Sequence, residues 1–374
     1  MNDRQEINDE LKEQSDRLAA PPDMAALLSG RPILVTGADG FVGSHLTEML
    51  LDLGARVHVF VRGRSSGFLN NIGHLRDRLV VHRGDLTDQD AVLRALKALR
   101  SEGGRPVIFH LAAQAHVGES WARPYETIAT NLLGTLNLLR SILDLDLDIH
   151  KLDTAGSSEE YGNISEEMRE YYRLNDQGLI LDERSPVNPQ SIYATSKLAA
   201  DFLSRSFFRA YGLPVVVTRM FNNYGPRQSP RFVTGAIITQ ALSSDVIRLG
   251  YVMAKRDFCF VRDGAMGHMH AALLGKPGEV YVYGYGQNVS ILEWRNMIID
   301  IGRQEGYWGE KTFETETPEL GRLGKSEVLE LRVDYGKLHT LTGWKPQHTW
   351  EQGLRETIQW YAENRSRWQG QLGR

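Results

Sequence analysis

The chain has 374 residues, with 43 Lys plus Arg against 47 Asp plus Glu and a formal net charge of −4, which suits a two-lobed protein and excludes a strongly basic nucleic-acid-binding surface. The single cysteine, Cys259, excludes an internal disulfide and a cysteine-rich zinc site, so we predict no metal. No apolar run is long enough to cross a bilayer and residues 1–30 are too charged for a secretory signal, so we expect a cytoplasmic protein without membrane or nucleic-acid partners.

Three regions follow one another along the chain. Residues 1–30 are rich in charged side chains, which are followed by Pro21-Pro22, and they are predicted to form an accessory arm. Between residues 31 and 220, runs that are apolar throughout alternate with helical periodicity, which predicts an α/β fold with a doubly wound parallel sheet covered on both faces. The mixed short segments of residues 221–374 predict a smaller substrate-binding lobe of mixed α/β structure, with segments that can exchange between the two lobes. Strands are expected over 33–35, 57–61, 79–81, 107–109 and 214–218, and helices over 125–143 and 193–211.

A glycine-rich segment joins the first strand to the first helix of this region. Gly37 permits a tight turn, Gly40 a close approach to a pyrophosphate, and Gly43 the packing of helix on strand. The helix N-terminus adds N–H groups for phosphates. An ordinary strand-to-helix turn is the alternative, but the position at the first strand of a βαβ series favours a Rossmann-type dinucleotide site. From this segment we predict as cofactor-binding residues Gly37, Asp39, Gly40, Phe41, Val42 and Gly43.

The end of the second strand indicates which dinucleotide binds. An Asp or Glu there would hold the ribose hydroxyls of NAD, but this chain has Arg62 and Arg64 with two serines. A guanidinium matches phosphate oxygens, so NADP is favoured, with NAD as the second choice. The alternative is that both arginines are solvated. Further cofactor contacts are expected at the ends of the third and fourth strands, from Asp85, Leu86, Leu111, Ala112 and Ala113.

Tyr193 and Lys197 form a Tyr-x-x-x-Lys pattern at the start of a predicted helix. They lie about one helical turn apart and therefore on one face. A cation beside a phenol lowers the pKa of the phenol, which suits a general base that takes a proton from a sugar hydroxyl. A surface pair is the alternative. The glycine-rich segment upstream favours the catalytic interpretation, in which both residues also contact the cofactor.

A polar segment follows the strand centred on Leu152. At the carboxyl end of such a strand, Ser157 can donate to a substrate oxygen and Glu159 can remove a carbon-bound proton next to a ketone. The alternative is a solvated Ser/Glu turn, and this is the interpretation we prefer for Glu160. Asp153 lies within the strand itself, so it requires a partner if the strand is regular.

Taken together, the glycine segment, Ser157-Ser158-Glu159, Tyr193-x-x-x-Lys197 and residues 219–226 resemble the extended short-chain dehydrogenase/reductases that act on nucleotide sugars as epimerases or dehydratases. Residues 62–68, 114–118, 231–234 and 343–346 are most similar to GDP-mannose 4,6-dehydratases and GDP-4-keto-6-deoxy-mannose reductases. The resemblance implies a nucleotide-diphosphate sugar substrate and a homodimer or homotetramer. It implies as substrate-binding residues Ser120, Asn222, Phe232, Val233, Arg256 and Arg322; for Arg256 a salt bridge to Asp257 or Asp263 is the alternative.

The resemblance also implies a mechanism of three stages. Tyr193 takes the proton of the carbon-4 hydroxyl as hydride leaves, Glu159 then removes the carbon-5 proton with loss of water from carbon 6, and the hydride returns to carbon 6. An NADPH-dependent reductase or an epimerase is the alternative within the family, and an NADP-binding protein without activity is the alternative outside it. Ile192 replaces a usual proline, Ser157 a usual threonine, and residues 165–178 lengthen the loop before Tyr193, where they are expected to affect the choice of sugar.

Overall fold

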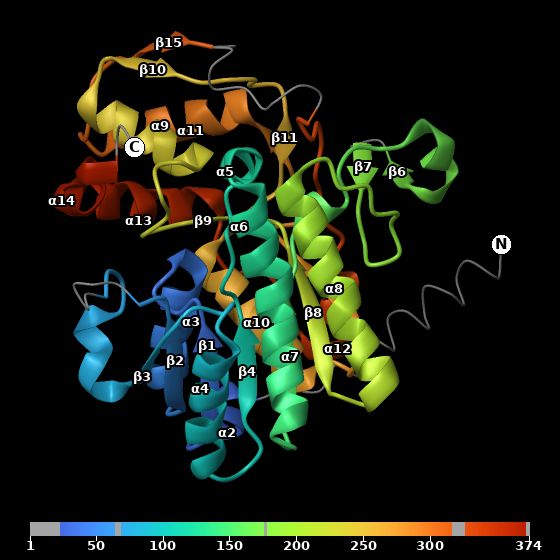
Figure 1. Cartoon of the computed structure of the whole chain (residues 1–374). Coiled ribbons are helices and arrows are strands. Elements are labelled where there is room, and N and C mark those ends of the chain that lie inside the picture. Colours follow the sequence, from blue (N-terminus) through green and yellow to red (C-terminus); the bar gives the residue numbers. More distant parts are fainter. Residues whose placement is uncertain (1–22, 64–68, 176–177, 316–325, 372–374) are drawn as a thin grey trace, which may run out of the picture.

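The computed structural model describes residues 23–63, 69–175, 178–315 and 326–371. Its centre is a seven-stranded sheet in the order β13-β8-β5-β4-β1-β2-β3 (Figure 1). Every neighbouring pair in it is parallel. The strands are β1 (Pro32–Thr36), β2 (Arg56–Val61), β3 (Val80–Arg83), β4 (Val107–His110), β5 (Lys151–Ala155), β8 (Val215–Met220) and β13 (Val280–Tyr283). The chain runs outward from β1 to β3 and returns to β4 on the other side of β1, so a ligand crevice is expected at the carboxyl ends of β1 and β4.

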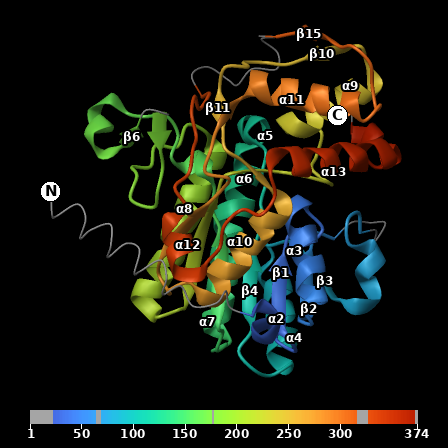
Figure 2. The ribbon, with the colours of Figure 1, turned by 180° about the vertical axis from the view of Figure 1, so that it is seen from behind.

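Helices cover both faces of the sheet, which confirms the predicted doubly wound fold. On the face seen in Figure 2, α3 (Phe41–Asp52) and α10 (Val261–Leu274) bury Leu46, Leu50 and Met269 against the strands. On the opposite face, α4 (Gln89–Ser101), α7 (Gly134–Asp144) and α8 (Ile192–Tyr211) pack over a second apolar cluster that includes Leu96 and Leu139. The short helix α2 (Met24–Leu28) adds Leu28 to the first cluster, while residues 1–22 of the predicted arm lie outside the described residues.

The helix predicted over 125–143 is divided into three parts. It consists of α6 (Pro124–Ile128), a π-helical turn over Ala129–Leu133, and α7. The apolar stripe that predicted it does not lie wholly in the core: Tyr125 is 90% exposed and Leu136 is 36% exposed. The prediction of the buried face was wrong there because the side that packs inward carries polar residues, among them Thr130 and Asn131, and the Asn131 amide donates to the Gln114 carbonyl oxygen and the Ser196 hydroxyl.

The second lobe lies beyond the carboxyl ends of the sheet strands (Figure 1). Its core is built on α9 (Val233–Ser243), α11 (Ile291–Gln304) and α13 (Trp350–Glu363), where Phe258 stacks on Trp294 at 4.2 Å between ring centroids. Short strands complete it: β9 (Asn222–Tyr224) with β12 (Phe258–Phe260), β10 (Val246–Arg248) with β15 (Thr312–Glu314), and β11 (Lys255–Arg256) with β14 (Val289–Ser290). The remaining short helices are α5 (Val117–Ala122), α12 (Gly336–Thr342) and α14 (Arg365–Trp368), with 3₁₀ turns at Gly73–Arg78, Ser158–Glu160, Glu166–Tyr171 and Gln369–Gln371.

The C-terminal half of the chain contributes to both lobes. Strand β13 pairs with β8 at the edge of the large sheet, and α10 packs against α3 and the central strands. These two elements come from the segment expected to form the substrate lobe, in the kind of exchange that the sequence allows for. After residue 220 the chain enters the second lobe, returns to the large sheet for α10 and β13, and then goes back to the second lobe.

The lengthened loop before Tyr193 forms a small hairpin of its own. Strands β6 (Arg173–Asn175) and β7 (Gly178–Ile180) pair antiparallel, and the side chain of Arg332 donates to the carbonyl oxygens of Gly178 and Leu179. Leu179 is buried in a cluster with Leu331 and Val333. The insertion is therefore docked on residues 328–333 of the chain.

Among the described residues, no helix is both long enough and apolar enough to cross a membrane.

Candidate active site

The glycine-rich turn after β1 is closed tightly against the end of β4. Gly37 has a φ of 74°, and a Cβ there would lie 2.7 Å from the backbone nitrogen of Ala112. A Cβ on Gly43 would lie 2.3 Å from the carbonyl oxygen of Gly37. The N-cap of α3 is Gly40, which has no side chain to cover the first N–H groups of the helix. Bare backbone and a helix N-terminus therefore meet at this turn, as the binding of a dinucleotide pyrophosphate requires.

Asp39 shapes the wall of this turn. Its carboxylate accepts the backbone N–H groups of Asn70 at 2.9 Å and Asn71 at 2.7 Å. Predicted as a cofactor residue, Asp39 thus holds the loop that follows β2 in place beside the turn. Phe41 and Val42 begin α3 and pack partly against the core of the second lobe.

The residues predicted around the adenosine end lie on neighbouring strand ends. Arg62 directly follows β2, is 59% exposed, and has loose ion pairs with Asp85 at 3.7 Å and Glu126 at 3.8 Å. Asp85 accepts both the N–H and the hydroxyl of Thr87, which with Arg62 lowers its pKa although burial opposes the shift. Leu86 is buried. Arg64 lies outside the described residues.

Leu111, Ala112 and Ala113 follow β4 and face the glycine-rich turn from the other side. Ala112 donates its N–H to the Thr36 hydroxyl at 3.2 Å, and Leu111 donates to the Thr36 carbonyl oxygen. Because the side chains of Ala112 and Ala113 are small, they project little from the strand end beside Gly37. The structure therefore brings the two predicted segments of the cofactor site together.

Ser157 and Tyr193 meet at the carboxyl end of β5. Ser191 caps the start of α8, so Tyr193 lies in the first turn of that helix, and its hydroxyl is hydrogen-bonded to the side chain of Ser157. Lys197, one turn further on, donates from Nζ to the carbonyl oxygen of Ala155 at 2.8 Å. All three side chains are buried. The structure thus brings together the hydroxyl pair and the lysine that the sequence predicts.

The predicted lowering of the Tyr193 pKa is wrong for this arrangement. Burial raises the pKa of Tyr193 well above its usual value, the hydrogen bond to Ser157 opposes this, and the carboxylates of Glu159 and Glu160 raise it further. Lys197 does not counter these effects because its ammonium is directed at the Ala155 carbonyl oxygen. Burial also lowers the pKa of Lys197 itself to about 8.

Glu159 and Glu160 share a 3₁₀ turn that Ser157 caps. The Glu159 N–H donates to the Ser157 hydroxyl at 3.2 Å, and the Glu159 side chain is buried beside the hydroxyl pair, as the catalytic interpretation requires. The interpretation of Glu160 as a solvated side chain was wrong, because it is fully buried and lies 2.9 Å from Nε of Arg219. Its partner is distant in sequence, so the local pattern gives no sign of this contact.

The polar residue inside β5 finds its partners across the sheet. Asp153 accepts the Thr218 hydroxyl at 2.9 Å and lies 2.6 Å from Nδ1 of His268 on α10. The strand is regular at this point. The negative charge of Asp153 raises the pKa of Lys197 against the effect of burial. Asp153 is therefore part of the buried polar layer beneath the hydroxyl pair.

Two further residues of this layer are missed by the sequence reasoning. His110, at the end of β4, lies between the hydroxyls of Thr36 at 2.8 Å and Thr135 at 3.0 Å, and burial lowers its pKa to about 3. Asn131, on the π-helical turn, donates to the Ser196 hydroxyl at 2.9 Å and so joins this turn to α8. For Asn131, the signal available in the sequence is a polar residue within an otherwise apolar helical pattern.

The predicted substrate-binding residues that the structure describes come from separate elements of the fold. Ser120 is buried on α5 and donates to the Val117 carbonyl oxygen, and Phe232 and Val233 form the start of α9. The buried Oδ1 of Asn222 has no hydrogen-bond partner among the described residues, which leaves an acceptor available to a ligand. Arg322 lies outside the described residues.

Arg256 forms an ion pair, but with a partner other than the two that the sequence suggests. It donates to Glu327 at 2.7 Å. Asp257 instead accepts the backbone N–H groups of Tyr285 and Gly286, and burial raises its pKa to about 7. The partner is distant in sequence, so the two nearby aspartates misled the prediction.

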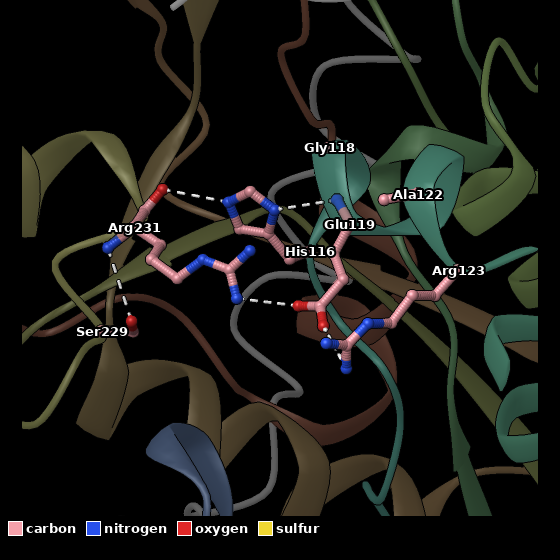
Figure 3. A pocket seen from close by; sticks show the side chains of 7 residues that line it. All are labelled: His116, Gly118, Glu119, Ala122, Arg123, Ser229 and Arg231. Carbon is pink, nitrogen blue, oxygen red and sulfur yellow. Dashed lines mark hydrogen bonds and ion pairs between the residues drawn. The ribbon is translucent and has the colours of Figure 1, made fainter. Parts of the chain in front are cut away.

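A cavity of about 540 Å³ opens between α5 and the segment before α9 (Figure 3). Arg231 crosses from the second lobe to pair with Glu119 at 2.7 Å, and Nε2 of His116 lies 3.2 Å from the Arg231 carbonyl oxygen. The Phe232 ring lies edge-on to His116, with 5.5 Å between ring centroids. Of the predicted substrate residues, Phe232 lies next to this cavity through its contact with His116.

Residues 34–357 match a family described as GDP-mannose 4,6 dehydratase. The chain belongs to this family. It is 31% identical over 350 residues to the dTDP-glucose 4,6-dehydratase of Xanthomonas campestris pv. campestris, an alignment that covers 91% of this chain and 95% of that protein. Membership in the GDP-mannose 4,6 dehydratase family confirms the predicted extended short-chain dehydrogenase/reductase, and with it an enzyme of the nucleotide-sugar dehydratase type.

Solved structures of related enzymes have the same fold. The dTDP-glucose 4,6-dehydratase of Bacillus anthracis, in complex with NAD, has a TM-score of 0.76 at 28% identity and covers 91% of this chain and 99% of its own. A double mutant of the dTDP-glucose 4,6-dehydratase of Streptomyces venezuelae, with NAD bound, has a TM-score of 0.76 at 30% identity and covers 90% and 99%. The architecture of the GDP-mannose 4,6 dehydratase family therefore extends over nearly the whole chain.

Proposed function

We propose that the protein is a nucleotide-diphosphate-hexose 4,6-dehydratase. The observation that carries the proposal is the burial of the Glu159 carboxylate beside the Ser157–Tyr193 hydroxyl pair, at the strand end next to the glycine-rich turn. Oxidation of an alcohol needs only the hydroxyl pair, whereas loss of water also needs a base for a carbon-bound proton. The names of the relatives support a 4,6-dehydratase, and they favour dTDP-glucose as the first substrate to test, with GDP-mannose as the second.

The residues present fit a nicotinamide dinucleotide. The turn from Gly37 to Gly43 leaves backbone where side chains would collide, and the first N–H groups of α3 have no side-chain cap. When bound, the cofactor accepts a hydride from the sugar and returns it later. The chain's own part is to hold the pyrophosphate at the α3 N-terminus and the ring end between the two strand ends.

The hydroxyl pair and Glu159 divide the proton transfers. Tyr193 acts as the phenolate: its oxygen, hydrogen-bonded to Ser157, takes the proton of the carbon-4 hydroxyl, and Ser157 holds the same oxygen in line. Glu159 then takes the proton of carbon 5, which the ketone at carbon 4 makes acidic, and passes this proton to the hydroxyl at carbon 6, which leaves as water. Because these side chains are buried, water has little access to the reacting atoms.

The replacement Glu159→Gln tests this assignment. An amide cannot accept the carbon-5 proton, so we expect water loss to fall by about 10²-fold or more while oxidation at carbon 4 continues. Product is followed by mass spectrometry after incubation with dTDP-glucose, GDP-mannose and UDP-glucose. The matched control is Glu166→Gln, an exposed glutamate in the same stretch of chain. Formation of the 4-keto-6-deoxy product at the parent rate by Glu159→Gln contradicts the role, and stoichiometric consumption of added NADPH by the parent indicates a reductase instead.

We propose NADP as the preferred cofactor because the end of β2 carries Arg62 and no carboxylate. Its ion pairs of 3.7 and 3.8 Å are loose enough for a 2′-phosphate to compete. We expect Arg62→Ala to weaken NADP binding by roughly 10-fold and to leave NAD binding unchanged, as measured by fluorescence titration of the reduced cofactors. Arg78→Ala, an exposed arginine paired with Asp52, is the control. Tighter binding of NAD than of NADP by the parent protein contradicts the proposal.

We also propose that the protein forms a homodimer. Helices α6, α7 and α8 pack against one another and carry exposed apolar side chains, among them Tyr125 and Phe202, with Leu133 exposed on the turn between α6 and α7. Apolar groups gathered on a surface favour association with a matching surface, and a second copy of the chain supplies one.

The cytoplasmic location predicted from the sequence remains a prediction.

A further inference from the structure

A buried carboxylate lies directly behind the hydroxyl pair and has no part in the chemistry proposed above. Glu160 is fully buried on the 3₁₀ turn, and its Oε1 accepts the backbone N–H of Ser157 at 2.7 Å. Its own carbonyl oxygen accepts the N–H of Asn188, in the segment that leads to α8. A Cβ on Gly156 would lie 2.6 Å from Oε1 of Glu160, so glycine at 156 leaves room for the carboxylate. Glu160 is therefore bound to the residue that holds the Tyr193 hydroxyl.

An arginine connects this carboxylate to the helix of Tyr193. Arg219 on β8 lies with Nε 2.9 Å from Glu160 and with Nη2 2.7 Å from Asp201 on α8. A further N–H of Arg219 donates to the Tyr161 hydroxyl at 3.2 Å. Asp201 is paired in turn with Arg205, one turn along α8. The turn of Ser157, the strand β8 and the helix of Tyr193 are thus joined by charged side chains.

These charges are costly to bury. Glu160, Asp201 and Arg219 are all removed from water, and each member of such a group depends on the others to offset the free energy of its burial. A carboxylate that also accepts the backbone N–H of a reacting residue has, in addition, a geometric effect on the reaction. When ionised, the same carboxylate adds a negative charge beside Tyr193 and Lys197.

We infer that Glu160 is a positioning residue, which joins the Ser157 turn to the Tyr193 helix through Arg219 and, in its ionised form, adds a negative charge behind the hydroxyl pair. The inference rests on the proposed function only in taking Ser157 and Tyr193 as the proton-transfer pair. It assigns Glu160 no contact with substrate. Its effect is exerted through the place of Ser157 and through charge.

The sign of the charge effect follows from the groups around the pair. Glu159 and Glu160 raise the pKa of Tyr193, and Glu160 with Asp153 raises that of Lys197 against burial, while Lys197 in turn lowers the pKa of the buried His110. Burial raises the pKa of Glu160 itself to about 8, with Asp201 in the same direction and with Arg219, the Ser157 N–H and Lys197 opposing. Neutralising Glu160 therefore lowers the pKa of Tyr193 and lets the pair give up its proton at lower pH.

Glu160→Gln separates charge from shape, because the amide oxygen can still accept the Ser157 N–H. We expect the acidic limb of the pH profile for hydride transfer to move to lower pH by roughly half a unit or more, with KM unchanged. Glu160→Val removes the acceptor as well, and we expect the same shift together with a kcat lower by about 10-fold. Hydride transfer is followed in single turnovers by the absorbance of the reduced cofactor. Glu170→Gln, on the exposed insertion, is the control.

A loss of kcat without movement of the limb assigns Glu160 a purely structural role and overturns the inference, as does a Glu160→Val variant identical to the parent. A second readout is independent of turnover. The phenolate titration of Tyr193 is obtained as the ultraviolet difference between each protein and its Tyr193→Phe counterpart. We expect Glu160→Gln to lower the midpoint, and an unchanged midpoint overturns the inference. If no nucleotide sugar is dehydrated but the midpoint moves, the proposed function fails and the inference stands.

Discussion

Replacing Tyr193 by phenylalanine is expected to lower kcat by about 10²- to 10⁴-fold with little effect on folding. The lost hydroxyl is the group that takes the proton of the sugar alcohol, and its hydrogen-bond partner is Ser157. The aromatic ring that packs in the first turn of α8 stays in place, so the midpoint of thermal unfolding should change by only a few degrees at most. Steady-state rates with the substrate found in the nucleotide-sugar panel, together with circular dichroism, measure both quantities.

Two companion variants make this result specific. Tyr171→Phe removes a hydroxyl from a side chain that is 65% exposed on the insertion, and it should behave as the parent. Ser157→Ala removes the partner hydroxyl and should also reduce kcat, because Tyr193 then loses the hydrogen bond that lowers its pKa. Full activity of Tyr193→Phe would contradict the entire assignment of the hydroxyl pair.

The largest loss of stability is expected for Arg219→Met. Methionine fills much of the same volume but leaves Glu160 and Asp201 buried in the same layer without the guanidinium between them. Removing one partner of a buried ionic group costs about 3–5 kcal/mol; here Glu160 loses its ion pair and Asp201 keeps only its pair with Arg205. Equilibrium unfolding in urea at pH 7.5, chosen so that roughly all exposed carboxyl groups are ionised, measures this loss.

The pH dependence of this variant has a definite sign. In the parent protein burial already raises the pKa of Glu160 to about 8 from its usual 4.5, so the folded state binds more protons than the unfolded state across that window. Stability from this group is therefore present below the window and is lost as the pH rises through it. Without Arg219 the pKa rises further, so the deficit of Arg219→Met should shrink on acidification. Arg209→Met, on the exposed end of α8, is the control, and a deficit that is constant with pH would contradict the account.

The parts of the fold that follow from local pattern were predictable. Apolar runs at Ile33–Val35 and Val107–Phe109 became β1 and β4, and the glycine spacing located the turn between β1 and α3. The buried face of the helix after residue 125 was not predictable, because α7 has apolar residues on two sides and only tertiary packing decides which is covered. The pattern alone also gave no sign of the π-helical turn at Asn131, since this turn depends on contacts with α8.

The candidate site was predictable in its residue types and not in its charges. Tyr193, Lys197 and Ser157 could be placed by spacing and by strand ends. The interpretation of Glu160 failed because its partner, Arg219, is brought near by the pairing of β8 with β5. The partner of Arg256 failed for the same reason, since Glu327 comes from a distant segment. The direction of the Tyr193 pKa depends on burial and on where Lys197 points, and a sequence specifies neither locally.

The position of β13 at the edge of the large sheet bears on how the chain emerges from the ribosome. The outer edge of strand β8 has no neighbour until residues 280–283 are synthesised, and the face covered by α10 stays open until residues 261–274 are made. An open strand edge and an uncovered apolar face favour aggregation. The nascent chain therefore carries an exposed sheet while these residues are synthesised, and completion of the cofactor lobe awaits the second half of the chain.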